Sequence, residues 1–374
     1  MFKEFIKVNS CLVCAKYIDL KFTHSELIPE FCLTVTSSPR LKALTLSNIT
    51  PIREVVKGLK KIYKQKKEFF QEIKELDISS NTFEGDIDTL KDFLKLFPKV
   101  KTLNISGCGL AEDIVEIIGD INKGLKVIKM SLNGITADIC NGLKFLFPRK
   151  LQQLELDGNW LGMKGVYNLR WWFIETGARL KVLNLSNNKI FRDEHNAEYL
   201  ASLLSHVPNL EELNLGVNSM EDEDLAILTK PISDMQSLTR LTMNTGLLKK
   251  NAAQYIISIL TALKNLVMLN LMSNILEDEG CGKIFEHLKD NNSLKCLDLS
   301  SNRTKGECIE KLLEYAENFY NGRELMIKLM GSISLPAKKK ELITKLKAIR
   351  STKPHFALDV KLKPNSNPKI IKPY

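Results

Sequence analysis

The chain has 374 residues, 44% of them hydrophobic, and a formal net charge of +10. No apolar run approaches the roughly 18 residues of a membrane-spanning helix, and Met1–Ala15 lacks the continuous apolar centre of a secretory signal. We therefore expect no membrane-spanning segment and a cytoplasmic location. In that reducing compartment the eight cysteines stay reduced.

An eleven-residue phrase, Leu-x-x-Leu-x-Leu-x-x-Asn-x-Leu/Ile, recurs along the chain at intervals of 25 to 32 residues. In the copy that starts at Leu180, Leu183 and Leu185 point to one side of a short strand, and Val182 and Asn184 point to the other. A period of this length predicts a solenoid of stacked repeats. Clear copies also start at Ile73, Leu125, Leu151, Leu210, Leu266 and Leu294; degenerate ones start at Leu41, Val100, Leu238 and near Glu324; a weaker one surrounds Ile18 and Leu20.

The asparagine of the phrase is predicted to be structural, because its amide can both donate to and accept from the backbone of the turn that follows the strand. A stretch with helical spacing of apolar residues follows the turn, as in Ala197–Val207. The asparagines at this position are Asn81, Asn133, Asn159, Asn188, Asn218, Asn274 and Asn302, and Cys108 and Gly246 replace it in two copies.

The phrase and its helical second half resemble the ribonuclease-inhibitor-like class of leucine-rich repeats, from about Leu41 to Met330. The resemblance implies an α/β leucine-rich-repeat solenoid of about 11–12 repeats, a right-handed horseshoe with a parallel concave sheet and convex helices. Because each repeat buries its apolar face on its neighbours, we expect one solenoid over 41–335. The class includes Ran GTPase-activating protein and tropomodulin, so this fold alone does not fix a function.

Residues 1–40 are expected to form an N-terminal capping region with the weak first repeat. A zinc site built from Cys11, Cys14, His24 and Cys32 is the alternative interpretation of this region. Their spacing matches no standard zinc knuckle or ribbon, and a second Cys-x-x-Cys is missing. We therefore predict small core cysteines here and no metal.

The Leu41 repeat is the longest and runs Ser47-Asn-Ile-Thr-Pro-Ile-Arg53. It resembles the early repeat of Ran GTPase-activating proteins, in which Ser-Asp-x-Phe-Thr-Gly-Arg presents a functional arginine. The resemblance implies a role for Arg53 in stabilising charge during phosphoryl transfer. However, Thr-Pro-Ile replaces Phe-Thr-Gly, and no phosphate-binding loop or nucleophile elbow occurs. We predict a rim arginine, no enzyme activity and no cofactor, with GTPase activation through Arg53 as the alternative.

Alternation along the strands predicts two rows of side chains on the concave face. These rows mix small polar, acidic and apolar groups, which suits protein recognition better than the stacking of nucleic-acid bases. We select Asp77, Glu155, Glu212, Arg240 and Asp298 as candidate partner contacts. The central row is Thr45, Asp77, Asn104, Lys129, Glu155, Asn184, Asn214, Thr242, Asn270 and Asp298; the row beside it is Ala43, Glu75, Thr102, Val127, Gln153, Val182, Glu212, Arg240, Met268 and Cys296.

Two further features lie on the predicted helices. Trp171 and Trp172 are adjacent, so they cannot both face the core side of one helix. Since Trp is favoured in interface hot spots, Trp172 is a candidate contact, and packing against a neighbouring repeat is the alternative.

Acidic clusters at the helix starts are expected mainly to complement the helix dipoles. They are Glu112–Asp113, Glu221–Asp224 and Glu277–Glu279.

The C-terminal segment from Gly331 onward carries ten Lys and one Arg against Glu341 and Asp359. An apolar stripe that includes Leu342 and Ile349 predicts a capping helix over 336–352. Residues 353–374 are predicted to be a basic Pro/Lys tail without a core. Lys361 and Lys363 are candidate contacts to an acidic assembly such as a microtubule lattice, with nucleic acid as the weaker alternative.

Together these features predict an intracellular protein-interaction scaffold, a structural subunit of a cytoskeletal or axonemal assembly in the cytoplasm, the cytoskeleton or a cilium. Its protein partner is expected on the concave face. Tropomodulin-like actin regulation is a second alternative, although the tropomyosin-binding helices of that family are absent before Ile18.

Overall fold

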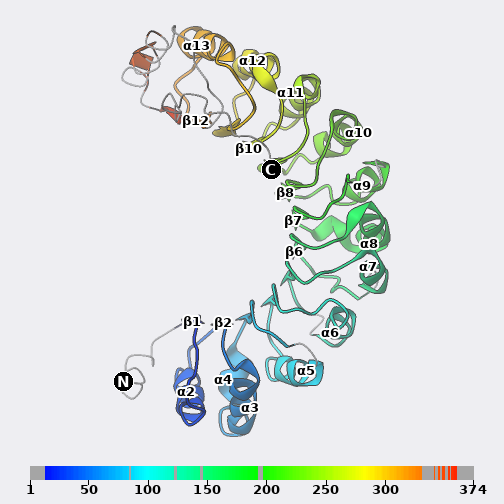
Figure 1. The fold of residues 1–374 in the computed structure, drawn as a ribbon, viewed down its shortest axis with the longest axis vertical. Helices are drawn as coiled ribbons and strands as arrows, with labels where there is room; N and C mark the ends of the chain where they lie inside the picture. The colour runs from blue at the N-terminus through cyan, green and yellow to red at the C-terminus, as the bar shows by residue number, and fades with distance from the viewer. Residues whose placement is uncertain are drawn as a thin grey trace, which may run out of the picture. The chain divides into compact units, whose positions relative to one another are not determined.

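The computed structural model describes residues 13–83, 86–121, 124–143, 146–192, 197–330, 341, 344–345, 348–349, 353 and 355–359. The chain forms two compact units, Met1–Asn188 and Lys189–Tyr374. Within each unit, short strands line one side and helices line the other (Figure 1). None of the helices in the described ranges is long and apolar enough to cross a membrane.

In the first unit, strands β1 to β7 lie side by side in chain order and pair in parallel. The helices between them lie on the opposite side of the unit (Figure 1). The elements are β1 (Cys14–Ile18), α2 (Leu27–Val35), β2 (Ala43–Ser47), α3 (Ile52–Ile62), α4 (Lys67–Glu72), β3 (Glu75–Asp77), α5 (Ile87–Lys95), β4 (Thr102–Asn104), α6 (Ile114–Asp120), β5 (Val127–Lys129), α7 (Ala137–Leu143), β6 (Gln153–Glu155), α8 (Gly162–Thr176) and β7 (Val182–Asn184).

The second unit continues the same alternation. Its strands β8 to β13 are also parallel and in chain order. The elements are α9 (Ala197–Leu204), β8 (Glu212–Asn214), α10 (Asp222–Ser233), β9 (Arg240–Thr242), α11 (Ala253–Ala262), β10 (Met268–Asn270), α12 (Glu277–His287), β11 (Cys296–Asp298), α13 (Cys308–Asn318), β12 (Leu325–Lys328) and β13 (Phe356–Asp359).

The inward side chains of the strands explain why these short segments form a stable sheet. Leu76, Leu103, Leu154 and Leu183 are at most 2% exposed, and each belongs to a different copy of the phrase. Complete burial of one such side chain stabilises the fold by roughly 1.5–3 kcal/mol, so the stacked leucines hold together strands of only three residues. Each predicted copy from Leu41 onward carries a strand, which confirms the predicted leucine-rich-repeat solenoid of parallel strands and flanking helices.

The asparagines of the phrase are structural, as predicted, and they also join neighbouring repeats, which was not predicted. The Asn159 amide donates to the carbonyls of Met130 at 3.1 Å and Leu156 at 2.8 Å. Its oxygen accepts from the N–H groups of Asn133 at 2.9 Å and Ile135 at 3.0 Å. Asn159 is 1% exposed, so it satisfies four backbone groups that water cannot reach.

At the N-terminus, the strand register differs from the one that Ile18 and Leu20 suggest. Ala15 pairs with Leu44 and Tyr17 with Leu46, so Ala15 and Tyr17 take the inward positions of β1. Ile18 is 52% exposed. The Tyr17 ring instead contacts Phe31 of α2 edge-on, with the ring centroids 5.1 Å apart, and this aromatic contact replaces the leucine packing of the later repeats.

At the C-terminus, the structure places a strand inside the segment that we predicted to be a tail. Strand β13 pairs with β12, and Phe356 is 2% exposed with its ring centroid 5.2 Å from that of Tyr320. The ammonium of Lys353 donates to the carbonyl of Ala316. The prediction of a coreless tail is therefore wrong for Phe356–Asp359, because one buried aromatic ring and a strand partner outweigh the basic, proline-rich composition around them.

The predicted capping helix lies largely outside the described residues. Those that are described, Glu341, Thr344, Lys345, Ala348 and Ile349, are helical, and Ile349 is 6% exposed. Lys361 and Lys363 lie outside the described residues. The boundaries 1–40, 41–335, 336–352 and 353–374 otherwise stay predictions.

Candidate functional site

The strand registers confirm the two predicted rows of side chains on the sheet. In the first unit the central row runs through Lys16, Thr45, Asp77, Asn104, Lys129, Glu155 and Asn184. In the second unit it runs through Asn214, Thr242, Asn270, Asp298, Lys328 and Asp359. The rows place the five predicted concave contacts on the sheet face as expected, and whether they bind a partner stays a prediction.

Two of these predicted contacts have a structural role. Asp77 accepts a hydrogen bond from the N–H of Ser79 at 2.9 Å, and Asp298 accepts one from the N–H of Ser300 at 3.0 Å. Such a bond to the residue two positions on is the Asx turn, which ends a strand. The same bond is made by Asn104, Asn184, Asn214 and Asn270. The Asp/Asn-x-Ser spacing in several copies was a sequence signal for this role.

The other three predicted concave contacts are paired with charges on the same face. The Lys129 ammonium lies 2.9 Å from a Glu155 carboxylate oxygen. A guanidinium nitrogen of Arg240 lies 2.6 Å from a carboxylate oxygen of Glu212. The Arg240–Glu212 pair is exposed and such a pair is worth at most about 1 kcal/mol, so it can be exchanged for contacts with a partner at little cost; the Lys129–Glu155 pair is half-buried.

Arg53 lies in the first turn of α3, with its Nε 3.6 Å from a carboxylate oxygen of Asp86. A hydrogen bond from Thr89 and, more weakly, the positive charges of Arg53 and Lys57 hold the pKa of Asp86 below its usual value. Asp86 is therefore an anionic N-cap of α5. This pairing fits the rim arginine that we predicted, and a GTPase-activating role for Arg53 stays untested.

Of the two adjacent tryptophans of α8, one is buried and the other is exposed. Trp172 is 3% exposed, and its ring centroid lies 5.3 Å from that of Phe147 and 4.8 Å from that of Phe173. Trp171 is 45% exposed. The choice of Trp172 as a partner contact was therefore wrong, because this indole fills the core beside the preceding repeat; the exposed indole is that of Trp171.

Two of the acidic clusters at the helix starts contact the next repeat, through Asp222, which accepts a hydrogen bond from the N–H of Lys249 at 2.7 Å, and through Asp278. Asp278 accepts hydrogen bonds from the N–H groups of Lys305 at 2.6 Å, Gly306 at 3.0 Å and Cys308 at 2.9 Å. Burial works to raise the pKa of Asp278, but these N–H groups outweigh it and the pKa is lowered. The carboxylate of Asp278 thus caps α13 in the next repeat, which is a structural role.

A row of lysines that the sequence analysis overlooked lies where the strands of the first unit begin. Lys42, Lys74, Lys101 and Lys126 hold the second position of the phrase in four consecutive copies. From Lys74 onward, the N–H of each lysine donates to the carbonyl of the lysine before it at 2.7–2.8 Å. We call the cationic residues along this side of the sheet the basic edge: Arg40, Lys42, Lys74, Lys99, Lys101, Lys126, Arg149, Lys150, Arg179 and Lys181.

The basic edge has few acidic neighbours. Lys42 pairs with Glu72, and Lys99 lies 3.9 Å from the same carboxylate. The hydrogen bond from Lys42 and the nearby charges of Lys42, Lys99 and Lys74 lower the pKa of Glu72. Within the described part of the chain, Lys101 and Lys126 form no ion pair, and both are exposed.

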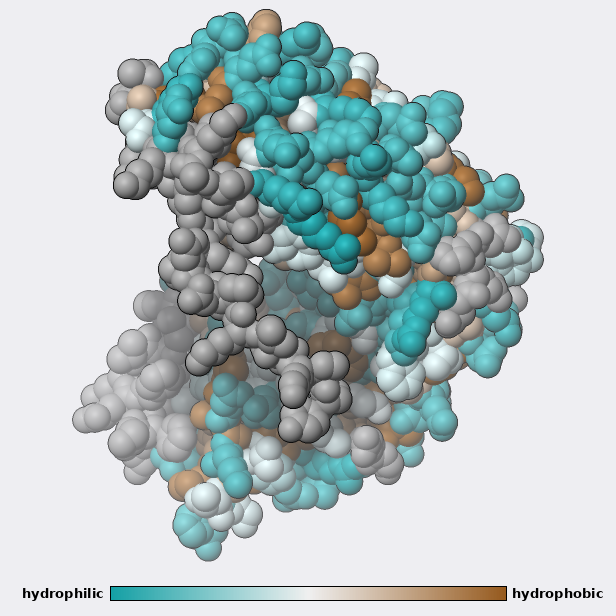
Figure 2. Space-filling view, turned by 45° about the horizontal axis from the view of Figure 1, so that its top comes forward, coloured by the Kyte–Doolittle hydropathy of each residue, from teal (hydrophilic) through white to brown (hydrophobic). Residues whose placement is uncertain are grey.

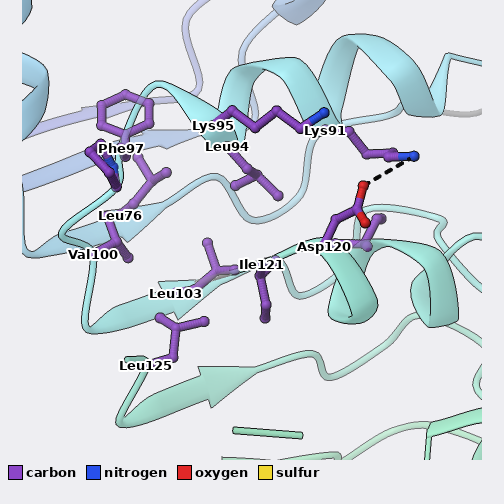
Figure 3. Close-up of a pocket in the computed structure, with 12 residues that line it drawn as sticks. Leu76, Lys91, Leu94, Lys95, Phe97, Val100, Leu103, Asp120, Ile121 and Leu125 are labelled. Atoms are coloured by element: carbon purple, nitrogen blue, oxygen red, sulfur yellow. Dashed lines mark ion pairs between the residues drawn. The ribbon is translucent and has the colours of Figure 1, made fainter. Parts of the chain in front are cut away.

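A cavity of about 310 Å³ opens between α5 and α6 (Figure 3). Its wall is mostly apolar, and Lys91 lies at one side with its ammonium 3.3 Å from a carboxylate oxygen of Asp120. On the face drawn in Figure 2, hydrophilic residues predominate over hydrophobic ones. The apolar lining is Leu76, Leu94, Phe97, Pro98, Val100, Leu103, Ile117, Ile121 and Leu125.

The described residues hold no group of three or more His, Cys, Asp or Glu side chains that could bind a metal ion. Of the cysteines in the zinc alternative, Cys14 is exposed, Cys32 is buried, and Cys11 lies outside the described ranges. Burial raises the pKa of the Cys32 thiol to about 12.

Comparison with known proteins supports the repeat assignment. The family model Leucine Rich Repeat matches residues 179–203, which hold the Leu180 copy of the phrase. Protein PAC2 of Saccharomyces cerevisiae is 28% identical over 145 residues, which are 38% of this chain and 26% of that protein. The match thus spans about a quarter of the yeast protein's length. The ribonuclease-inhibitor-like subclass stays a prediction.

Among solved structures, the chain is similar to an internalin from Listeria monocytogenes, with 17% identity, a TM-score of 0.45, and coverage of 83% of this chain and 86% of that one. It is also similar to the leucine-rich repeat-containing protein LegL7 from Legionella pneumophila. That similarity has 18% identity, a TM-score of 0.46, and coverage of 89% of this chain and 98% of that one.

Proposed function

We propose that this chain is a protein-interaction scaffold that acts as a structural subunit of a larger assembly. The observation that carries the proposal is the ordered array of side chains along the sheet: the central rows and the basic edge repeat from strand to strand on a buried leucine core. Such an array offers many fixed contacts to a protein surface. Of its charged groups, Glu155 and Arg240 form ion pairs, and Asp77 and Asp298 accept hydrogen bonds from backbone N–H groups. Lys101 and Lys126 are exposed, so the array also carries charges that a partner can contact.

We further propose a cytoskeletal or axonemal setting, with the basic C-terminal residues against an acidic surface such as a microtubule lattice. The charge of the segment after Met330 supports this setting, because it holds ten Lys and one Arg against two acidic residues. Since Phe356–Asp359 form a strand, we place these contacts after Asp359, at Lys361, Lys363, Lys369 and Lys372.

Cosedimentation with polymerised tubulin tests this setting. The full chain is expected to cosediment at low salt and to be released as ionic strength rises, because exposed charge contacts are screened beyond about 8 Å at physiological salt. A chain that ends at Asp359 keeps β13 and should bind more weakly, with an unchanged melting temperature. Equal and salt-insensitive binding of both chains would contradict a role for these lysines, and absence of binding by both would contradict the microtubule setting.

A further inference from the structure

The basic edge concentrates positive charge on a fixed backbone. Lys42, Lys74, Lys101 and Lys126 begin adjacent parallel strands, which lie about 4.8 Å apart. Like charges at this spacing repel one another, and Glu72 and Glu75 are the acidic residues within two positions of these lysines in the chain. A row of this kind raises the local concentration of anions and is stabilised when an anionic ligand lies along it.

The cavity between α5 and α6 adjoins the basic edge. Val100 and Leu125 line the cavity, and the residues that directly follow them are Lys101 and Lys126. Consecutive Cα atoms are about 3.8 Å apart, so the apolar wall and two exposed ammonium-bearing side chains share the same two loops. An apolar anchor point therefore lies next to an extended basic surface.

We propose that the basic edge and this cavity together bind an extended acidic peptide segment of a partner protein. Carboxylates of the segment pair with Lys74, Lys101 and Lys126, and one large apolar side chain, Phe or Leu, enters the cavity. This inference rests on the proposed scaffold function and names the chemistry of the partner. The volume of about 310 Å³ is at the lower end for ligand sites and suits a side chain better than a cofactor.

The spacing of the lysines is compatible with an extended chain. Side chains on one face of an extended peptide recur every 6.6–6.8 Å or so, against about 4.8 Å between the strands of the sheet. The long flexible stems of lysine absorb a difference of this size. An acidic segment that crosses the strand starts can therefore place several carboxylates within reach of successive ammonium groups.

The observations favour a peptide over a nucleic acid. Single-stranded nucleic acids are bound on exposed aromatic rings on which bases stack, and the residues on either side of Lys42, Lys74, Lys101 and Lys126 in the chain are not aromatic. Phe97 lines the cavity but is only 2% exposed. A base inserted there would bury its polar edge against leucine, isoleucine and valine side chains without hydrogen-bond partners, which is costly.

Fluorescence anisotropy with labelled peptides tests the proposal on the full chain. The probe is a fluorescein-labelled peptide with one Phe between two runs of Glu. We expect saturable binding that weakens as salt rises. Replacement of the Phe by Ala should weaken binding about tenfold or more, because burial of a large apolar side chain is worth roughly 1.5–3 kcal/mol.

Two matched protein variants locate the site. The double variant Lys101→Glu/Lys126→Glu reverses two charges of the basic edge and should weaken binding by about tenfold or more. The control Lys264→Glu/Lys305→Glu reverses two exposed charges in the second unit and should bind like the unmodified chain. Because all four lysines are surface residues, circular dichroism should show unchanged melting temperatures, so that a loss of binding reports on contact and not on folding.

Three results would overturn the proposal: equal binding of the Phe and Ala peptides, equal loss in both double variants, or tighter binding of a single-stranded oligonucleotide than of the acidic peptide. None of these results would contradict the scaffold function, because a partner could still bind the central rows of the sheet. Conversely, the scaffold function alone would be contradicted if the chain bound the peptide but captured no protein from an extract of its native source.

Discussion

Replacement of Leu183 by Asp is expected to destabilise the protein by about 4 kcal/mol or more. Leu183 is the inward residue of β7 and is 1% exposed. The substitution removes an apolar side chain from the core and puts a carboxylate in its place, with no cationic partner among the inward residues of the neighbouring strands. Urea denaturation followed by circular dichroism measures the change in the free energy of unfolding.

The control for this experiment is Val182→Asp, one residue earlier on the same strand. Val182 pairs with Gln153 in the outward row and is half-buried, so the new carboxylate reaches water. A loss of no more than about 1 kcal/mol is expected for this control. If the two variants lost the same stability, the assignment of inward and outward faces along the phrase would be wrong.

The second large effect concerns the tryptophans of α8. Trp172→Ala is expected to cost about 3–5 kcal/mol, the range for removal of a buried aromatic ring, because its indole packs on both Phe147 and Phe173. Trp171→Ala should cost about 1 kcal/mol or less, since this side chain is half exposed. Chemical denaturation of the two variants under identical conditions gives the comparison.

Tryptophan fluorescence of the same two variants adds an independent readout. Removal of Trp172 should leave a spectrum dominated by solvent-exposed indoles, because Trp160 and Trp171 are 60% and 45% exposed. The opposite order of stabilities, with Trp171→Ala the more harmful change, would mean that α8 is rotated relative to the structure described above.

The repeat pattern predicted the fold because it determines both the position of each strand and the side chains that point inward from it. The period fixes where each strand begins, and the alternation within the phrase fixes which side chains point inward, so a shift by one residue would expose every leucine of a strand. The buried asparagines add a requirement that few residue types meet, since Asn159 must both donate and accept. These constraints are local in sequence and could be recognised without a structure.

Other features depend on contacts that periodicity does not contain. Helical spacing could not decide which of Trp171 and Trp172 faces the core, because the answer depends on where Phe147 of the previous repeat lies. Strand β13 was missed because its composition is that of a tail, while its stability comes from Phe356 and a pairing with β12. In both cases a partner distant in sequence determines the structure.

The candidate surfaces were predicted only in part. The central rows followed from the alternation, and the Asp/Asn-x-Ser spacing was a further signal, which we did not use, for the Asx turns made by Asp77 and Asp298. The basic edge was visible in the sequence, since Lys occupies the same position in four consecutive copies. The alternation within the strands predicts only the two outward rows, and these lysines precede the strands, so the alternation does not single them out.

Affinity capture from the native source tests the scaffold function most directly. The tagged chain is compared with its Leu183→Asp variant, and the captured proteins are measured by quantitative mass spectrometry. A scaffold should retain at least one protein in near-stoichiometric amount, and the destabilised variant should lose it because the rows and the basic edge exist only in the folded sheet. Capture of no such protein, or of the same proteins by both chains, would contradict the account.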